Sequence, residues 1–300
     1  MVALTGKPSW DREGRDWPNR TASRFVVAGG ICWHVQIMGS GPPLLLLHGA
    51  GAATHSWRDL APLLARDFTI VAPDLPGHGF TDTPPDAALS LRGMSAALAD
   101  LLETLDVRPT VVVGHSAGAA IALRLALDRR NDACALISLN GALKPFPGAA
   151  GHVFPTLAKL LFLNPLAIQL FSWRASWPGA VARLIESTGS RIDEPGLDCY
   201  ARLLRATGHV AGALGMMANW DLTPLQSDLP RLAVPLTLVA ARNDRAVPPR
   251  VAAEIKASLT GADLVELPEL GHLAHEEAPH LVAQIVRQAA SKSGVLMGAS

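Results

Sequence analysis

The stretch that decides the fold runs from residue 109 to residue 130 and reads PTVVVGHSAGAAIALRLALDRR. Its first part, Val111–Val113, is a short apolar run typical of a buried strand, and its last part is typical of a helix. The two are joined by a Gly-x-Ser-x-Gly pentapeptide, and this strand–turn–helix context exposes a serine hydroxyl at the end of a strand. We therefore predict that Ser116 is a nucleophile and that Gly114 and Gly118 are small because backbone packs closely around the turn.

Strand-like and helix-like segments alternate on both sides of this stretch, which favours an α/β fold. A hairpin is expected around Gly29 and Gly30. The other expected strands lie at 42–49, 68–79, 133–142, 234–244 and 263–269. The expected helices lie at 56–65, 89–106, 249–258 and 278–290.

The alternation is interrupted once, between residues 143 and 232. This region contains apolar helical pieces broken by Pro and Gly, and no convincing strand. The simplest organisation is a discontinuous catalytic domain, residues 1–142 and 233–300, with a helical cap at 143–232 inserted after the sixth strand.

A serine hydroxyl needs a base to remove its proton, and the base is usually a histidine oriented by a carboxylate. Asp244 and His272 each follow a predicted strand, at the edge where an open α/β sheet places its site. Asp263 is a weaker candidate because it begins a strand. His275 is a weaker candidate than His272, because Gly271 precedes His272, and we expect it to be a capping or surface residue.

The predicted oxyanion hole consists of two backbone N–H groups, those of Ala117 and Ala50. Ala117 follows the nucleophile directly, and Ala50 lies in a His-Gly-Ala-Gly turn after an early strand. Several larger side chains are candidates for the substrate pocket, although His48 is also expected to be a structural hydrogen-bonding residue. These pocket candidates are His48, His115, Trp173, Trp177 and Trp220.

The composition of the chain limits the kinds of partner and cofactor to be expected. Lys and Arg number 26 and so do Asp and Glu, which gives no electrostatic reason to expect nucleic acid. Ten scattered histidines and three widely spaced cysteines form no metal-binding motif, and a dinucleotide fingerprint is absent, so we expect no metal and no cofactor. No secretory signal is visible at the N-terminus, which favours a cytoplasmic protein.

Taken together, HGAG at 48–51, DLPGHG at 74–79, GHSAG at 114–118, Asp244 and the Gly271–His272 pair resemble the α/β-hydrolase superfamily. The resemblance implies an eight-stranded, mostly parallel sheet with a helical cap after the sixth strand. Members with an aspartate nucleophile, such as haloalkane dehalogenases and epoxide hydrolases, are disfavoured by Ser116. Residues 10–20, 44–65 and 72–84 also resemble the magnesium-chelatase accessory proteins of bacteriochlorophyll synthesis.

Three hypotheses follow. The first is a serine hydrolase acting on an ester-like bond of an apolar substrate, associated with synthesis of magnesium porphyrins. The second is a non-catalytic accessory protein whose cap binds a porphyrin or a magnesium-chelatase subunit. The third is peripheral membrane contact through the apolar segment Val153–Phe171 of the cap, which would make the protein membrane-associated.

Overall fold

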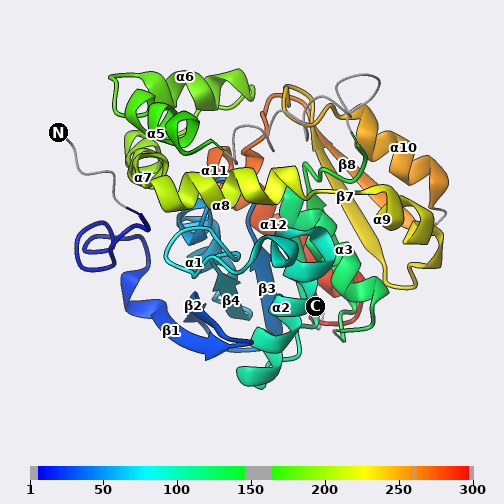
Figure 1. The fold of residues 1–300 in the computed structure, drawn as a ribbon. Helices are drawn as coiled ribbons and strands as arrows, with labels where there is room; N and C mark the ends of the chain where they lie inside the picture. The colour runs from blue at the N-terminus through cyan, green and yellow to red at the C-terminus, as the bar shows by residue number, and fades with distance from the viewer. Residues whose placement is uncertain (1–5, 131, 146–163, 260, 297–300) are drawn as a thin grey trace.

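The computed structural model describes residues 6–130, 132–145, 164–259 and 261–296. These residues form one eight-stranded sheet with the order β1-β2-β4-β3-β5-β6-β7-β8 (Figure 1). Strands β1 and β2 form an antiparallel hairpin, β2 pairs antiparallel with β4, and all later pairs are parallel. The strands are β1 (Ser23–Ala28), β2 (Ile31–Met38), β3 (Pro43–Leu47), β4 (Thr69–Pro73), β5 (Val111–His115), β6 (Ala135–Leu139), β7 (Leu236–Ala241) and β8 (Ala262–Leu267).

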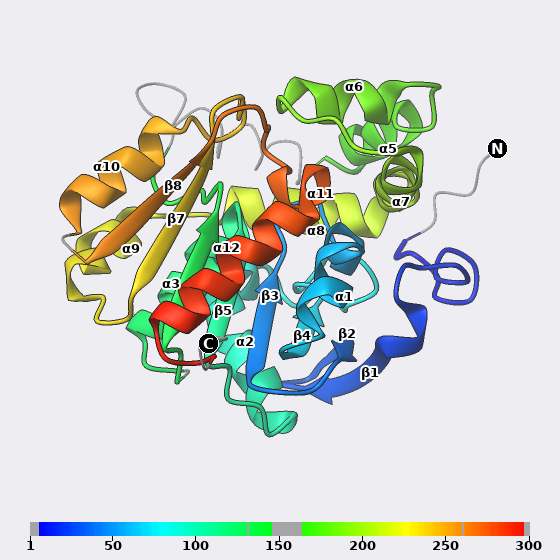
Figure 2. The same ribbon diagram turned by 180° about the vertical axis from the view of Figure 1, so that it is seen from behind.

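Helices cover both faces of the sheet (Figures 1 and 2). Helices α2 (Leu91–Thr104) and α3 (Ala117–Leu127) pack on one face, and α1 (Leu60–Leu64) and α12 (Pro279–Lys292) pack on the other. The central strands β5 and β6 are buried along their whole length, which explains their continuous apolar sequence. The other described helices outside the segment that follows β6 are α10 (Arg250–Ser258), α11 (Ala274–Glu277) and the short 3-10 helices η1 (Arg20–Ala22), η2 (Thr54–Trp57) and η3 (Asp86–Leu89).

The predicted sheet, its hairpin and its parallel core are confirmed, but one predicted helix is wrong in extent. Instead of a single helix over 56–65, the chain forms η2 and then the short α1. Pro62 explains the break, because its ring would clash with the carbonyl of residue 58 in a continuous α-helix.

A helical segment follows the sixth strand, as predicted. It occupies the described residues 164–231 and is called the helical insertion below. It contains α5 (Pro165–Arg174), α6 (Ala180–Ser187), α7 (Glu194–Arg205), α8 (Thr207–Ala218), α9 (Thr223–Asp228) and the 3-10 helix η4 (Leu229–Arg231). The division into two domains at 142/143 and 232/233 stays a prediction, and residues 146–163 of the predicted cap lie outside the described residues.

The apolar segment Val153–Phe171 falls partly within this gap, since residues 153–163 are outside the described part of the chain. No helix of the described residues is long and apolar enough to cross a bilayer.

Candidate active site

Ser116 lies at the sharp turn between β5 and α3. Its backbone has φ 52° and ψ −117°, a conformation that costs a non-glycine residue free energy and is often found at functional sites. A Cβ on Gly114 would lie 2.5 Å from the backbone of Ala119, and one on Gly118 would lie 2.2 Å from the Leu47 carbonyl oxygen. The two glycines of the pentapeptide are therefore required by close backbone packing.

His272 and Asp244 are paired at the same edge of the sheet. His272 Nδ1 donates to Asp244 Oδ2 at 2.7 Å, and the other carboxylate oxygen accepts the N–H groups of Ala246 and Val247 at 2.8 Å each. This arrangement leaves His272 Nε2 as the nitrogen that can accept a proton. Among the described residues no hydrogen bond to the Ser116 hydroxyl is recorded, so the serine–histidine contact is open in this conformation. Such contacts are often loose without substrate.

The turn with the predicted oxyanion donors lies against Ser116, because a Cβ on Gly49 would come within 3.0 Å of the Ser116 Cβ. No hydrogen bond from the N–H of Ala50 or of Ala117 is recorded within the described part of the chain. Both groups are therefore available to a ligand oxygen.

His209 in α8 holds the same turn from the helical insertion. Its Nε2 donates to the Gly51 carbonyl at 3.1 Å, and its Nδ1 accepts the Gly79 N–H at 3.0 Å. This pairing requires a neutral ring, and burial lowers the pKa of His209 to about 4. The helical insertion is thus coupled to the candidate oxyanion hole.

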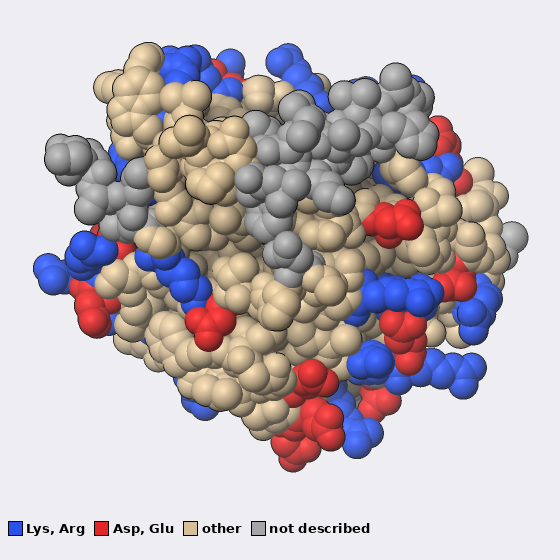
Figure 3. Space-filling model, viewed as in Figure 1, with Lys and Arg blue, Asp and Glu red and all other residues tan. Residues whose placement is uncertain are grey.

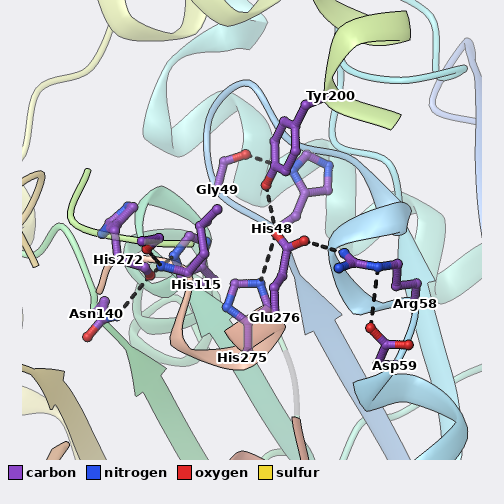
Figure 4. Close-up of polar contacts among 12 residues, drawn as sticks. His48, Gly49, Arg58, Asp59, His115, Asn140, Tyr200, His272, His275 and Glu276 are labelled. Atoms are coloured by element: carbon purple, nitrogen blue, oxygen red, sulfur yellow. Dashed lines mark hydrogen bonds and ion pairs between the residues drawn. The ribbon is translucent and has the colours of Figure 1, made fainter. Parts of the chain in front are cut away.

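Asn140, at the carboxyl end of β6, is a residue that the sequence analysis missed. Its Nδ2 donates to the carbonyl oxygens of Gly271 and His272 at 3.0 and 2.8 Å, and its Oδ1 accepts the Ala241 N–H at 2.8 Å (Figure 4). It therefore joins the loop of His272 to the strand that precedes Asp244. Its position directly after a buried strand, at the edge predicted for the site, is the signal that could have identified it.

The ring of His115 packs against His272, and the ring of His275 packs against His115. His115 Nε2 donates to the His272 carbonyl at 2.9 Å, and its ring lies 4.7 Å from that of His272 and 4.4 Å from that of His275. Burial lowers the pKa of His115 well below its ordinary value and that of His275 to about 3. The expectation that His275 is a cap or surface residue is wrong, because its ring is buried between His115 and Trp57.

A buried charge network links the helical insertion to α11, just after His272 (Figure 4). Glu276 accepts hydrogen bonds from Arg58 and from the Tyr200 hydroxyl, the latter at 2.8 Å, and Arg58 also pairs with Asp193 at 2.7 Å. Burial raises the pKa of Glu276 to about 7, against the opposing effects of Arg58 and Tyr200. The network ties α7 to the loop that carries the candidate base.

The five residues predicted to line the substrate pocket do not lie together in the structure. His48 is buried with both ring nitrogens bonded to the main chain, to the Gly49 carbonyl at 2.8 Å and the Leu75 N–H at 2.9 Å. Trp173 and Trp177 are exposed on the outside of the helical insertion, and Trp220 is partly buried against the hydrophobic core that includes residues of α2 and α3. Of these five candidates, His115 is the one for which the described residues record a contact with the candidate triad.

The volume of a surface hollow does not by itself identify the candidate active site. A hollow of about 690 Å³ lies between the Gly29–Gly30 turn, η3 and α2, and its lining includes Lys7, Asp82 and Asp100 but none of the candidate catalytic residues. In the described ranges, no group of three or more His, Cys, Asp or Glu side chains is arranged to hold a metal ion.

Comparison with known proteins agrees with this architecture. Residues 42–279 match the family model described as the alpha/beta hydrolase fold. The magnesium-chelatase 30 kDa subunit of Rhodobacter capsulatus is 41% identical over 265 residues, which cover 88% of this chain and 92% of the relative.

Two solved structures share the fold. An epoxide hydrolase has a TM-score of 0.75 and 23% identity, covering 90% of this chain and 98% of the other. A thermophilic esterase of Thermogutta terrifontis has a TM-score of 0.69 and 23% identity, with the same two coverages. At this level of identity the likeness extends to the fold alone, but together with the family match it allows one conclusion: the chain belongs to the α/β-hydrolase family.

Proposed function

We propose that the chain is a serine hydrolase in which Ser116, His272 and Asp244 form a catalytic triad. The observation that carries the proposal is the 2.7 Å hydrogen bond between His272 and a backbone-anchored Asp244, at the sheet edge where the strained Ser116 turn lies. In the same proposal, residues 143–232 form a cap on a catalytic domain made of residues 1–142 and 233–300.

The proposed reaction is hydrolysis of an ester-like bond. Ser116 Oγ attacks the carbonyl carbon while His272 Nε2 takes the hydroxyl proton, and Asp244 stabilises the resulting imidazolium. The N–H groups of Ala50 and Ala117 donate to the oxyanion. His272 then returns the proton to the leaving alcohol, and water, deprotonated by His272, hydrolyses the acyl-enzyme to release the acid.

An apolar substrate is supported by the composition, in which 49% of residues are hydrophobic and 17% are charged. A connection with magnesium-porphyrin synthesis is supported by the 41% identical relative, which is named as a subunit of magnesium chelatase. We therefore place esters of porphyrins among the substrates to be screened.

Labelling with a fluorescent fluorophosphonate tests the mechanism. Wild type and Ser187→Ala, which removes an exposed hydroxyl at the end of α6, should be labelled, and Ser116→Ala should not. Hydrolysis of nitrophenyl esters should fall by at least about 10³-fold in Ser116→Ala. Equal labelling of Ser116→Ala and wild type would rule out the mechanism.

A second candidate is a non-catalytic accessory protein that binds a porphyrin or a magnesium-chelatase subunit. The name of the 41% identical relative favours it. If Ser116→Ala fully restored function in a strain lacking this chain, the accessory role would replace the hydrolase. Absence of binding between the purified protein and either protoporphyrin or the chelatase subunits would exclude the accessory role.

A further inference from the structure

Helix α5 has apolar side chains on two opposite faces. Ile168 and Ser172 are buried against the rest of the helical insertion, whereas Leu166, Leu170 and Trp173 are 72%, 61% and 51% exposed. The spacing of four and then three residues places the exposed three on one stripe. Large apolar side chains that are exposed together on one stripe of a helix mark an interaction site, so the outer stripe calls for an apolar partner.

Aromatic side chains continue the stripe beyond the end of α5. Trp177 lies edge-on to Trp173, with 4.8 Å between the ring centroids, and the guanidinium of Arg174 lies 4.5 Å above the Trp177 ring. Indole rings with an arginine beside them suit the boundary between hydrocarbon and headgroups, because each has an apolar body and a polar tip. We call Leu166, Leu170, Phe171, Trp173 and Trp177 the α5 face.

The charges nearest to the α5 face are mainly positive. Between residues 164 and 187 the chain contains Arg174 and Arg183 and one acidic residue, Glu186 near the end of α6. In Figure 3 the surface over α5, at the upper left, is largely uncharged, with basic side chains and a smaller acidic area along its upper edge. An apolar face flanked mainly by cations complements a surface that is apolar inside and negatively charged outside.

A hollow of about 270 Å³ between α5 and α6 has the same character. Its lining is mainly apolar, with Phe171, Leu184 and Leu204, and both arginines border it. The apolar lining suits an acyl chain, and the positive charge of the two guanidinium groups would attract a phosphate group.

We infer that the α5 face docks on the surface of a bilayer that contains anionic lipid, with its Leu and Trp side chains in the interfacial region. Since no described helix can span a bilayer, the contact is interfacial. The inference goes beyond the proposed hydrolysis and does not depend on it. Docking would bring the helical insertion to the lipid bilayer, in which apolar esters dissolve.

Flotation with vesicles tests the inference on the full chain. The probes are vesicles of phosphatidylcholine alone and of phosphatidylcholine mixed equally with phosphatidylglycerol. Wild type should float with the mixed vesicles, and the double variant Leu166→Glu, Leu170→Glu should partition into them at least about tenfold less. The matched control is Val27→Glu, Leu281→Glu, which adds the same charge at two apolar positions, 70% and 41% exposed, on β1 and α12; it should float like wild type.

Fluorophosphonate labelling and circular dichroism should be unchanged in both double variants, which separates loss of binding from loss of fold. The inference is overturned if wild type stays in the dense fraction with both vesicles, or if the α5 variant floats like the control. It is also overturned in favour of self-association if wild type is a dimer without vesicles and the α5 variant is a monomer.

The arginines test the choice of lipid. Arg174→Gln, Arg183→Gln should weaken binding to the mixed vesicles and leave binding to phosphatidylcholine unchanged. Unchanged binding to both vesicles would overturn the assignment of anionic lipid.

Discussion

Two Ser/His/Asp sets occur in this fold, and the one with the more complete hydrogen bonding is not the candidate site. His34 Nδ1 donates to Asp74 Oδ2 at 2.8 Å, and the Ser23 hydroxyl donates to His34 Nε2 at 2.9 Å. Asp74 also accepts the N–H groups of Thr54 and Phe80, at 2.7 and 2.9 Å. In the candidate triad the histidine–carboxylate pair is equally well made, but the serine contact is open.

The two sets differ in access and in backbone strain. His34 and Asp74 are fully buried, and Ser23 lies in the regular strand β1, paired with Gln36 of β2. Ser116 lies in a strained turn near two N–H groups, those of Ala50 and Ala117, for which the described part of the chain records no hydrogen bond. The comparison shows that a bonded Ser/His/Asp chain can serve the fold. A site also needs an accessible hydroxyl and donors left free for the oxyanion.

The carboxylates allow the largest test of this comparison. Asp244→Asn should lower kcat by about 10⁴-fold, because the amide no longer holds His272 in the required tautomer. Asp74→Asn should leave kcat per fluorophosphonate-titrated site unchanged. It should lower the free energy of unfolding by about 3 kcal/mol, because it removes a buried charge that three groups contact. Ester turnover and urea unfolding of both variants provide the measurement.

The pKa of Asp74 is consistent with this structural role. Burial raises it, but His34 and the backbone donors outweigh burial and hold it well below its ordinary value. A fall of kcat in Asp74→Asn comparable to that in Asp244→Asn would break the distinction between the two sets.

A third histidine, His275, extends the comparison to the pH dependence of stability. In contrast to His34, neither ring nitrogen of the buried His275 has a hydrogen-bond partner among the described residues, and Nε2 lies 4.0 Å from Glu276 Oε1. Burial lowers the pKa of His275 from 6.5 to about 3. The unfolded chain therefore binds one more proton than the folded chain between these values, so stability is lost as pH falls below 6.5. His275→Phe should remove this contribution, which is about 1 kcal/mol for each pH unit.

The measurement is urea unfolding of wild type and His275→Phe at pH 7, 6 and 5. The wild type should lose more stability than the variant with each step down. Parallel losses in the two proteins would show that His275 is protonated in the folded state or does not titrate.

The residues that sequence analysis identified are those that local sequence patterns indicate. Ser116, Asp244 and His272 each lie in the turn or loop that follows a strand-like run, and parallel strands bring their carboxyl ends to one edge. The glycines of the Ser116 turn follow from the same local argument.

The missed features depend on pairings that no local pattern contains. The contact between His34 and Asp74 requires the antiparallel register of β2 and β4, which places Val35 opposite Pro73. Asn140 reaches a loop 131 residues away, and Arg58 reaches Glu276 across 218 residues. The outward position of Trp173 depends on which side of α5 packs against its neighbours, and an apolar sequence on both sides does not specify that side.

The central claim is that the Ser116 set, and not the Ser23 set, performs covalent chemistry. Mapping the fluorophosphonate adduct by mass spectrometry of the digested wild-type protein tests it most directly. The account predicts one adduct, on Ser116 in the tryptic peptide from 93 to 124, since trypsin does not cleave the Arg108–Pro109 bond. An adduct on Ser23, or ester turnover by a protein that carries no adduct on Ser116, would contradict it.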